Sequence, residues 1–463
     1  MNRSIKFLNP LIFSLLTGFS HSSFALEKPK TMDEMWKIIQ LQQQQIDELK
    51  AKTQPSTTST PVKIQSNDEV KTLEHKTDVL SQEVEKLRTN LSIPDEAKYK
   101  SMYGLGPAAS KVYGVSKGLS LGGYGEASYS GKVSDKGTKN DSADMYRMVL
   151  YAGYKFTDNI LFNSELEFEH GTTDKGGSVS VEFAALDFFL DPIANIRAGL
   201  VLMPMGFINT IHEPPFYFGN NRPEVERTII PSTWSELGVG LFGQITPELS
   251  YTTYAVTGLD AKGFSSKGIR EGRQLGSEAH AESFGFVGRV DYTPNAIPGF
   301  SVGGSAYLGE SGQDQIFNGK KLDVFTQLYE GHAQWKYKGW ELRALGAWGF
   351  IDDADQLSLA KNDTIGEENF GWYAEAGYDI LPLLFRDTSQ YLAPFFRYEH
   401  YDTLAKVPNG RSDDLTKDKE IYQVGVNYKP IPNVVIKADY RNIRNKKATP
   451  EADEFNLGLG FIF

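Results

Sequence analysis

The last ten residues, Glu454–Phe463, read EFNLGLGFIF. Chain termini are usually frayed and polar, whereas an apolar side chain at every second position is typical of a β-strand with one apolar face. We therefore predict that this stretch is a strand held in a sheet. Its apolar face comprises Phe455, Leu457, Leu459, Phe461 and Phe463, and its other face comprises Asn456, Gly458 and Gly460.

The same alternation recurs along most of the chain. In LSLGGYGEASYSG, which starts at Leu119, one face is apolar or small and the other carries Ser120, Glu126 and Ser128. We predict sixteen strands of this kind. They lie near residues 119–131, 144–156, 160–171, 178–190, 195–203, 234–244, 248–258, 284–293, 300–310, 324–337, 340–350, 369–380, 391–401, 420–429, 434–444 and 454–463.

The connections between these strands alternate in length. Those after odd-numbered strands are mostly long and polar, such as KVSDKGTKNDSA, and those after even-numbered strands are mostly short, such as TDN, ITP and KG. A soluble sandwich is not expected to alternate so regularly. In a transmembrane barrel, lipid contacts the apolar face, water fills the lumen and the two rims meet different compartments. The predicted fold is all-β: a 16-stranded antiparallel transmembrane β-barrel over residues 119–463, closed by pairing of its last and first strands.

Aromatic residues are frequent near the ends of the predicted strands, where an amphipathic ring fits the headgroup level of a membrane. We interpret them as two interfacial girdles. They are Tyr151, Tyr154, Phe156, Tyr251, Tyr254, Tyr292, Trp335, Tyr337, Trp340, Tyr378, Tyr428 and Tyr440.

The N-terminus predicts export. The apolar stretch FLNPLIFSLLTGF follows Arg3 and Lys6 and precedes a small-x-small site before Leu26, so residues 1–25 are predicted to be a secretory signal peptide. A membrane anchor is the alternative, but polar residues and a proline interrupt a core that is already too short. Loss of Arg3 and Lys6 reduces 48 basic residues to 46 against 59 acidic ones, a net charge of −13, which disfavours a nucleic-acid partner. The chain has no cysteine and therefore no disulfide bond.

Two heptad segments precede the barrel. Apolar residues follow a 3-then-4 spacing in residues 26–53 and again in 63–91, with the linker QPSTTSTPV at 54–62 between them and a second linker at 92–118. A narrow apolar seam buries itself best against copies of itself. We predict an α-helical coiled-coil extension that forms an intermolecular bundle. A helix packed within one chain is the alternative.

The sequence shows no motif for catalysis, metal binding or a cofactor. A nucleophile elbow, an HExxH pair, a Walker loop and EF-hand spacing are all missing, and the SLGGYGE glycines lie within a predicted strand. We expect no enzyme activity, although a barrel phospholipase or protease with its site in the lumen is an open alternative. An adhesin that works through its coiled coil is another. The order of segments disfavours it, because the helix precedes the first strand and so lies on the side of Phe463, in the periplasm.

Basic residues that alternate with lipid-facing residues are predicted to line the lumen. An arginine on the lipid face would cost about 2–4 kcal/mol at mid-depth, so the phase and the energetics agree. The alternative to a role in solute binding is that each arginine pairs with an inward carboxylate such as Glu165, Glu167, Glu182, Glu341, Glu399 or Asp439. The inward basic residues are Arg197, Arg289, Arg343, Arg397, Lys437 and Arg441.

The third long connection, residues 204–233, is the expected constriction. Its prolines suggest a stiff, folded-in segment. It adds Arg222 and Arg227 to the candidate solute-binding residues, but it also carries three glutamates, and its own charge is near neutral. His212 is expected to be an ordinary hydrogen-bonding loop residue.

The segments ILFNSELEFEHG, VEFAALDFFLDPIANIRAGLVLMPMG and ERTIIPSTWSELGVGLFG, together with the terminal Phe463, resemble the phosphate-selective porin O/P superfamily. With the heptad extension, the mature chain is most similar to the DcaP-like branch of outer-membrane porins. The resemblance implies a homotrimer among outer-membrane lipids, an inward third loop, and uptake of small anions, dicarboxylates above all. It also implies that the assembly machinery reads the terminal aromatic. Bracing of the trimer and contact with peptidoglycan are both open roles for the periplasmic extension.

Overall fold

The computed structural model describes residue 77 and residues 100–133, 140–174, 176–385 and 388–463. Apart from residue 77, these belong to one compact unit, Arg88–Phe463. The predicted signal peptide (1–25) and the linker at 54–62 lie outside the described residues, as do the coiled-coil segments at 26–53 and 63–91 apart from residue 77.

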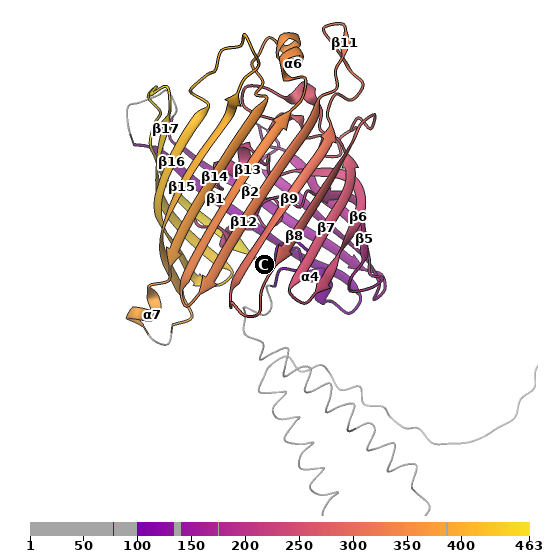
Figure 1. Ribbon diagram of the computed structural model, residues 1–463. Helices are drawn as coiled ribbons and strands as arrows, with labels where there is room; N and C mark the ends of the chain where they lie inside the picture. The colour runs from indigo at the N-terminus through magenta and orange to yellow at the C-terminus, as the bar shows by residue number, and fades with distance from the viewer. Residues whose placement is uncertain (1–76, 78–99, 134–139, 175, 386–387) are drawn as a thin grey trace, which may run out of the picture. The chain divides into compact units, whose positions relative to one another are not determined.

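Sixteen strands close into one antiparallel barrel (Figure 1), which confirms the predicted fold. A small hairpin, β10 (Ile316–Phe317) and β11 (Lys320–Lys321), forms a separate sheet. The barrel strands are β1 (Gly118–Lys132), β2 (Ser142–Lys155), β3 (Ile160–Glu169), β4 (Val179–Phe188), β5 (Asn195–Leu202), β6 (Ser235–Thr246), β7 (Leu249–Thr257), β8 (Phe284–Tyr292), β9 (Phe300–Glu310), β12 (Phe325–Tyr337), β13 (Trp340–Ile351), β14 (Glu368–Tyr378), β15 (Tyr391–Lys406), β16 (Asp418–Ile431), β17 (Val434–Asn445) and β18 (Glu454–Ile462).

The C-terminal stretch forms the seam of the barrel. The Gly123 N–H donates to the Phe463 carbonyl at 3.0 Å, and the Phe463 N–H donates back to the Gly123 carbonyl at 2.9 Å. On β18, Leu457 and Leu459 are exposed on the outer face, whereas Asn456 is fully buried on the inner face. The predicted alternation is therefore confirmed, and the terminal residue is part of the wall.

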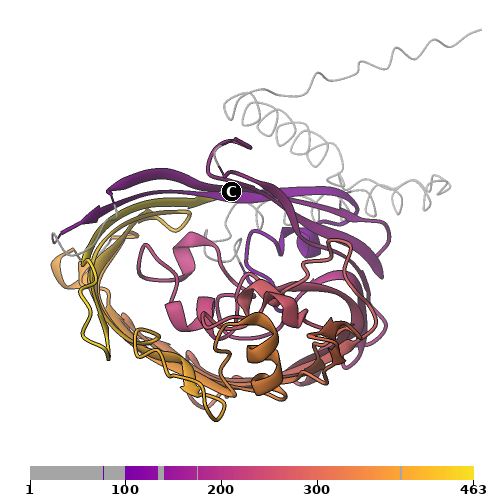
Figure 2. The same ribbon diagram turned by 90° about the horizontal axis from the view of Figure 1, so that it is seen from above.

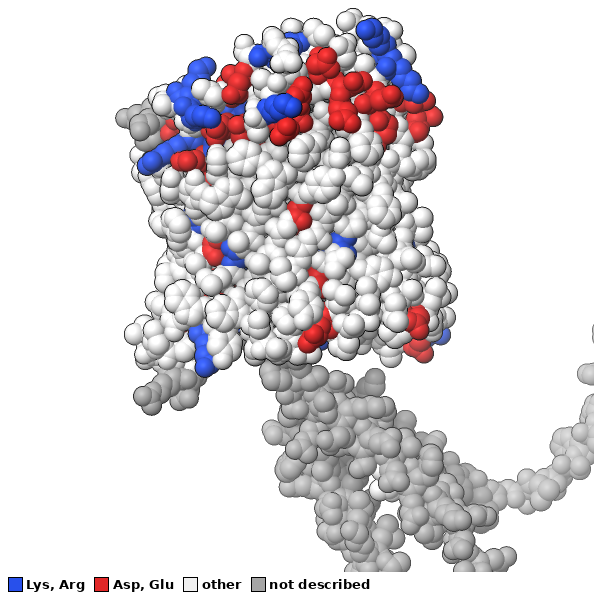
Figure 3. All heavy atoms as spheres, viewed as in Figure 1, with Lys and Arg blue, Asp and Glu red and all other residues white. Residues whose placement is uncertain are grey.

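The face of the barrel that Figure 3 shows has the charge distribution of a membrane-spanning barrel. Figure 3 shows a wide, mostly uncharged band below a rim where Lys, Arg, Asp and Glu gather. Six of the twelve predicted girdle aromatics, such as Trp340, are exposed on the outer surface, and four more are half-buried. Tyr151 and Tyr254 are neither, and their assignment to the girdles was wrong: both are buried inside the barrel. Each is three residues from an outward-facing or half-exposed tyrosine on its strand, and an odd spacing along a strand reverses the face.

The two rims differ as predicted. The long connections, with helix α6 (Ala354–Lys361) and the β10–β11 hairpin, lie at one end, called here the loop end (Figure 1). Short connections lie at the other, called the turn end, where α7 (Leu381–Leu384) lies outside the wall. None of the helices in the described ranges is long and apolar enough to cross a membrane.

Three segments occupy the interior of the barrel (Figure 2). The third loop, residues 203–234, carries η1 (Pro214–Phe216) and α5 (Glu224–Thr228). The fourth loop, residues 258–283, carries η2 (Ala261–Gly263) and η3 (Arg270–Gly272), and its apolar residues share one buried cluster with those of the third loop. The remaining segment, residues 102–113, lies shortly before β1 and includes the start of α4 (Lys111–Gly114). From the sequence, residues 92–118 were predicted to be a linker, and nothing in that prediction indicated that residues 102–113 pack inside the barrel.

Candidate functional site

The third loop is built into the lumen, as its prolines predicted. Two glycines on the inner face of β18 make room for it. A Cβ atom on Gly458 would lie 2.1 Å from Asn220 Oδ1, and one on Gly460 would lie 2.3 Å from Pro214 Cβ. The Asn220 N–H donates to Asp439 Oδ2 at 2.6 Å. The third loop therefore packs on Gly458 and Gly460, the small residues on the inner face of the last strand.

A buried glutamate fixes the other half of the loop. Glu226 Oε2 accepts the Ile208 N–H at 2.6 Å, and Glu226 Oε1 accepts the Tyr373 hydroxyl of β14 at 2.6 Å. The Val225 N–H donates to Glu399 Oε2 of β15 at 3.2 Å. These bonds hold α5 against the wall. His212 is also held against the wall. Its ring is buried, and its Nε2 lies 3.0 Å from Glu165 Oε1 of β3.

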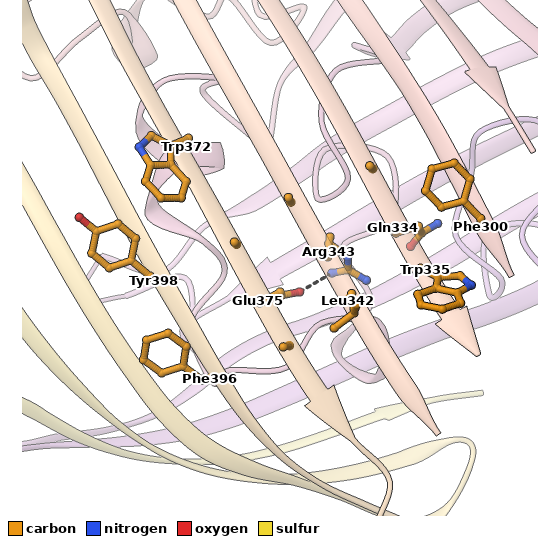
Figure 4. A pocket seen from close by; sticks show the side chains of 13 residues that line it. Phe300, Gln334, Trp335, Leu342, Arg343, Trp372, Glu375, Phe396 and Tyr398 are labelled. Atoms are coloured by element: carbon orange, nitrogen blue, oxygen red, sulfur yellow. Dashed lines mark ion pairs between the residues drawn. The ribbon is translucent and has the colours of Figure 1, made fainter. Parts of the chain in front are cut away.

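Five of the predicted inward basic residues form ion pairs. Arg397 Nε lies 2.8 Å from Glu375 Oε2, and Arg343 Nη1 lies 3.0 Å from Glu375 Oε1 (Figure 4). The remaining pairs are Arg197 Nε with Asp187 Oδ1 at 2.7 Å, Arg289 Nε with Asp291 Oδ2 at 2.6 Å, and Arg441 with both Glu224 Oε1 at 3.1 Å and Glu454 Oε2 at 3.0 Å. Of the six carboxylates named from the sequence, only Glu399 pairs with one of these arginines, at 3.7 Å from Arg397.

Lys437 is not available to a solute. Its side chain is buried, Nζ donates to the Gly219 carbonyl at 3.0 Å, and the ammonium lies 3.5 Å from the centre of the Tyr217 ring. A cation over an aromatic face is attracted by the ring quadrupole. This lysine therefore anchors the third loop to β17.

Arg227 and Arg222 differ from the strand arginines. Arg227 Nε pairs with Glu224 Oε2 at 2.8 Å, but its side chain is 53% exposed. Burial favours the neutral form of Glu224, yet the charges of Arg227 and Arg441 outweigh burial and lower its pKa to about 2. Arg222 is half-buried and donates only a long bond, 3.4 Å, to the His212 carbonyl. Within the described part of the chain, no carboxylate lies within 4.0 Å of the Arg222 guanidinium.

Sequence reasoning missed two arginines of the fourth loop. Arg270 Nη1 donates to the Arg227 carbonyl at 3.1 Å, and Arg273 Nε donates to the Arg270 carbonyl at 2.9 Å. Neither forms an ion pair with a described carboxylate. Burial, followed by the charges of Arg273 and Arg227, lowers the pKa of Arg270 below its usual range. We call Arg222, Arg227, Arg270 and Arg273 the arginine cluster. The only signal in the sequence was the short run REGR within a long polar loop.

A third arginine that sequence reasoning missed, Arg147, forms ion pairs within the wall. Arg147 of β2 lies 2.8 Å from Glu126 Oε1 and 3.3 Å from Glu167 Oε1, and it is buried. It therefore neutralises inward carboxylates of β1 and β3. The arginine cluster differs from these strand arginines, because three of its four members, Arg222, Arg270 and Arg273, form no ion pair with a described carboxylate. The fourth member, Arg227, pairs with Glu224, but its side chain is 53% exposed.

A cavity of about 570 Å³ lies across β9 and β12–β15 but belongs to the outer face (Figure 4). Its lining is mainly apolar and includes the exposed side chains of Trp335, Trp372 and Phe396. It is therefore not a site for a hydrophilic solute. The described residues also include no group of three or more His, Asp or Glu side chains placed to hold a metal ion.

A closed barrel with an apolar outer band, charged inner walls and an inward-folded loop defines a transmembrane channel of the porin class. Comparison with known proteins agrees. The family model for phosphate-selective porin O and P matches residues 250–462. An uncharacterized protein of Aquifex aeolicus (strain VF5) is 38% identical over 397 residues, which cover 82% of this chain and 87% of that protein. The chain belongs to the phosphate-selective porin O and P family and is an outer-membrane porin.

One solved structure shows the same fold at low identity, and a second is a weaker match. A loop L8 deletion mutant of OmpT, an outer membrane protein of Vibrio cholerae, matches with a TM-score of 0.50 and 11% identity, over 75% of this chain and all of that chain. The outer membrane channel DcaP of Acinetobacter baumannii matches with a TM-score of 0.49 and 12% identity, over 74% of this chain and 97% of that chain.

Membership of this family also bears on whether the chain is an enzyme. Porins let solutes diffuse through their lumen and catalyse no reaction, so this chain functions in transport rather than as an enzyme.

Proposed function

We propose that this porin is a homotrimeric diffusion channel for small hydrophilic solutes that prefers small organic anions such as dicarboxylates. The observation that carries the proposal is the arginine cluster. Most of the charged side chains inside the barrel are paired, whereas Arg222, Arg270 and Arg273 have no carboxylate partner among the described residues. Their positive charge therefore remains available to a passing solute.

The chemistry of guanidinium groups favours carboxylates. A guanidinium presents a planar fork of N–H donors that matches the two oxygens of a carboxylate. Adjacent loops supply several such forks, because the Arg270 guanidinium of the fourth loop donates to the main-chain carbonyl of Arg227 in the third loop. A solute with two carboxylates can engage two guanidinium groups at once, whereas a monocarboxylate engages one. For this reason we expect the channel to prefer dicarboxylates over monocarboxylates.

Phosphate is the second candidate. Arginine also binds phosphate through two parallel hydrogen bonds, and the family is named for phosphate selectivity. The two candidates differ in reach, because phosphate is compact and a dicarboxylate spans several bonds. Competition between them for the open channel therefore ranks the two anions.

Liposome swelling tests this proposal. Purified porin in liposomes should admit a four-carbon dicarboxylate faster than a neutral solute of equal size. Arg222→Gln should reduce that advantage by about fivefold, since a unit charge at about 4 Å in water contributes about 1 kcal/mol. Arg444→Gln is the matched control, because Arg444 is exposed and, among the described residues, contacts only Asn442 and the Tyr422 ring. Equal rates for the dicarboxylate and the neutral solute would contradict the proposal, and stronger competition by phosphate than by dicarboxylate would favour the second candidate.

The remaining parts of the proposal concern assembly. The heptad segments at 26–53 and 63–91 support a trimer that is braced by a coiled coil, with the signal peptide at 1–25 removed on export. The turn end and the extension would then face the periplasm, where contact with peptidoglycan is open. Native mass spectrometry of the full mature chain should give a trimer. A trimer that is equally stable after Leu80→Asp and Leu87→Asp would contradict the role of the extension.

A further inference from the structure

We propose that residues 102–113, called here the lumen insert, are a second narrowing element of the channel. In this role they limit the size of solutes near the turn end and hold the third loop in position. Figure 2 shows this segment, in indigo, inside the ring of strands. The proposal concerns pore size, so it does not depend on which anion the channel prefers.

The insert packs tightly against the inner face of the barrel wall. Residues 105–110 are all buried, as is Val112. Two glycines of the wall face it. A Cβ atom on Gly122 of β1 would lie 2.9 Å from the Ala108 carbonyl oxygen, and one on Gly153 of β2 would lie 2.6 Å from Val112 Cγ2. The wall is therefore shaped to receive this segment, since a larger side chain at either glycine would collide with it.

Polar contacts fix the two ends of the insert. Arg197 of β5 donates from Nη1 to the Tyr103 carbonyl at 3.3 Å and from Nη2 to the Tyr113 hydroxyl at 2.9 Å. The Tyr113 hydroxyl donates in turn to Asp187 Oδ2 of β4 at 2.7 Å. Asn163 of β3 donates to the Ala109 carbonyl at 2.9 Å. Arg197, expected from the sequence to face the solute, thus acts as a positioning residue for the insert.

The insert is also joined to the third loop. The Ala108 and Ala109 N–H groups donate to Glu213 Oε1 at 2.9 and 3.3 Å. Glu213 is fully buried and directly precedes η1, whose Phe216 packs on the same apolar cluster as Leu105. A displaced insert would therefore remove one support of the third loop as well as widen the lumen.

Gly153→Leu in the full chain is the main test. The leucine should expel Val112, increase the single-channel conductance by about twofold and admit larger neutral sugars, because the open cross-section grows. The control is Gly331→Leu on β12, where a Cβ atom would meet no atom within 4 Å. A Gly153→Leu barrel that assembles yet keeps the wild-type conductance and size limit would overturn the proposal.

A cysteine pair keeps the test decisive if that variant does not assemble. The chain has no cysteine, so Val112→Cys with Gly153→Cys gives a single defined pair. Val112 Cβ lies 2.8 Å from the ideal Cβ position of residue 153, which is near the range for a disulfide after a small adjustment. We expect cross-linking in the assembled barrel, with the conductance of wild type in the oxidised state and a conductance at least as large after reduction, because reduction frees the insert from residue 153. Failure to cross-link, or a cross-linked barrel whose conductance exceeds that of the reduced form, would overturn the proposal.

Discussion

The strand arginines are predicted to stabilise the barrel rather than to select solutes, and Arg397 tests this best. Its guanidinium is fully buried and pairs with Glu375 at 2.8 Å. It also donates from Nη1 to Gln423 Oε1 at 3.0 Å and to the Asn221 carbonyl of the third loop at 3.1 Å. Arg397→Met removes these bonds and leaves Arg343 as the partner of Glu375. Glu399, buried and 3.7 Å from Arg397, then has no cation beside it on its strand.

Removal of one partner from a buried ion pair costs about 3–5 kcal/mol, because the other charge stays desolvated. Urea unfolding of the barrel in lipid vesicles should show a loss of this size for Arg397→Met. The exposed control Arg444→Gln should stay within about 0.5 kcal/mol of wild type. Addition of Glu399→Gln should recover part of the loss, since it removes the unpaired carboxylate. A loss below about 1 kcal/mol for Arg397→Met would refute a structural role for this arginine.

Two further predictions concern the seam and the contact between the lumen insert and the third loop. Phe463→Ser should reduce the amount of assembled barrel in the outer membrane more than it reduces the conductance per channel, because it removes the ring that packs over Gly123 and stacks on Phe461 at the closing seam. Immunoblotting of membranes and single-channel recording measure the two quantities. Burial raises the pKa of Glu213 to about 8 against the N–H bonds from Ala109 and Ala108, with Glu165 adding to the rise. The packed arrangement of the insert and the third loop around this buried carboxyl is therefore most stable below the ordinary carboxyl pKa of 4.5. It loses stability as the pH rises toward 8, because the charge that forms stays desolvated. Conductance should therefore increase between pH 7 and pH 9 in wild type and stay flat in Glu213→Gln, and equal pH profiles for the two proteins would contradict this account.

The fold was predictable because strand alternation and loop lengths are local properties of the sequence. The alternation in Glu454–Phe463 identified the closing strand, and it also placed Gly458 and Gly460 on the inner face. What those glycines accommodate was not visible, because the third loop lies more than two hundred residues earlier in the chain. Contacts at such separation depend on the closed topology.

Ion pairing was less predictable for the same reason. Arg343 and Glu375 face each other because β13 and β14 pair in a register that the sequence does not specify. Arg270 and Arg273 lie in a long loop with no periodic pattern, and residues 102–113 form almost no regular structure. Segments of this kind are positioned by tertiary contacts alone. The sequence identified where charge lies along each strand, but the partners of each charge come from the register.

The reversal potential in a planar bilayer under a salt gradient tests the central claim most directly. Wild-type channels should show the sign of anion preference. Arg222→Gln combined with Arg270→Gln should reduce the anion-to-cation permeability ratio by about tenfold or more, since each charge contributes about 1 kcal/mol near the ion path. Arg444→Gln should leave the ratio unchanged. A cation preference in wild type, or a ratio that the double substitution does not alter, would contradict the account.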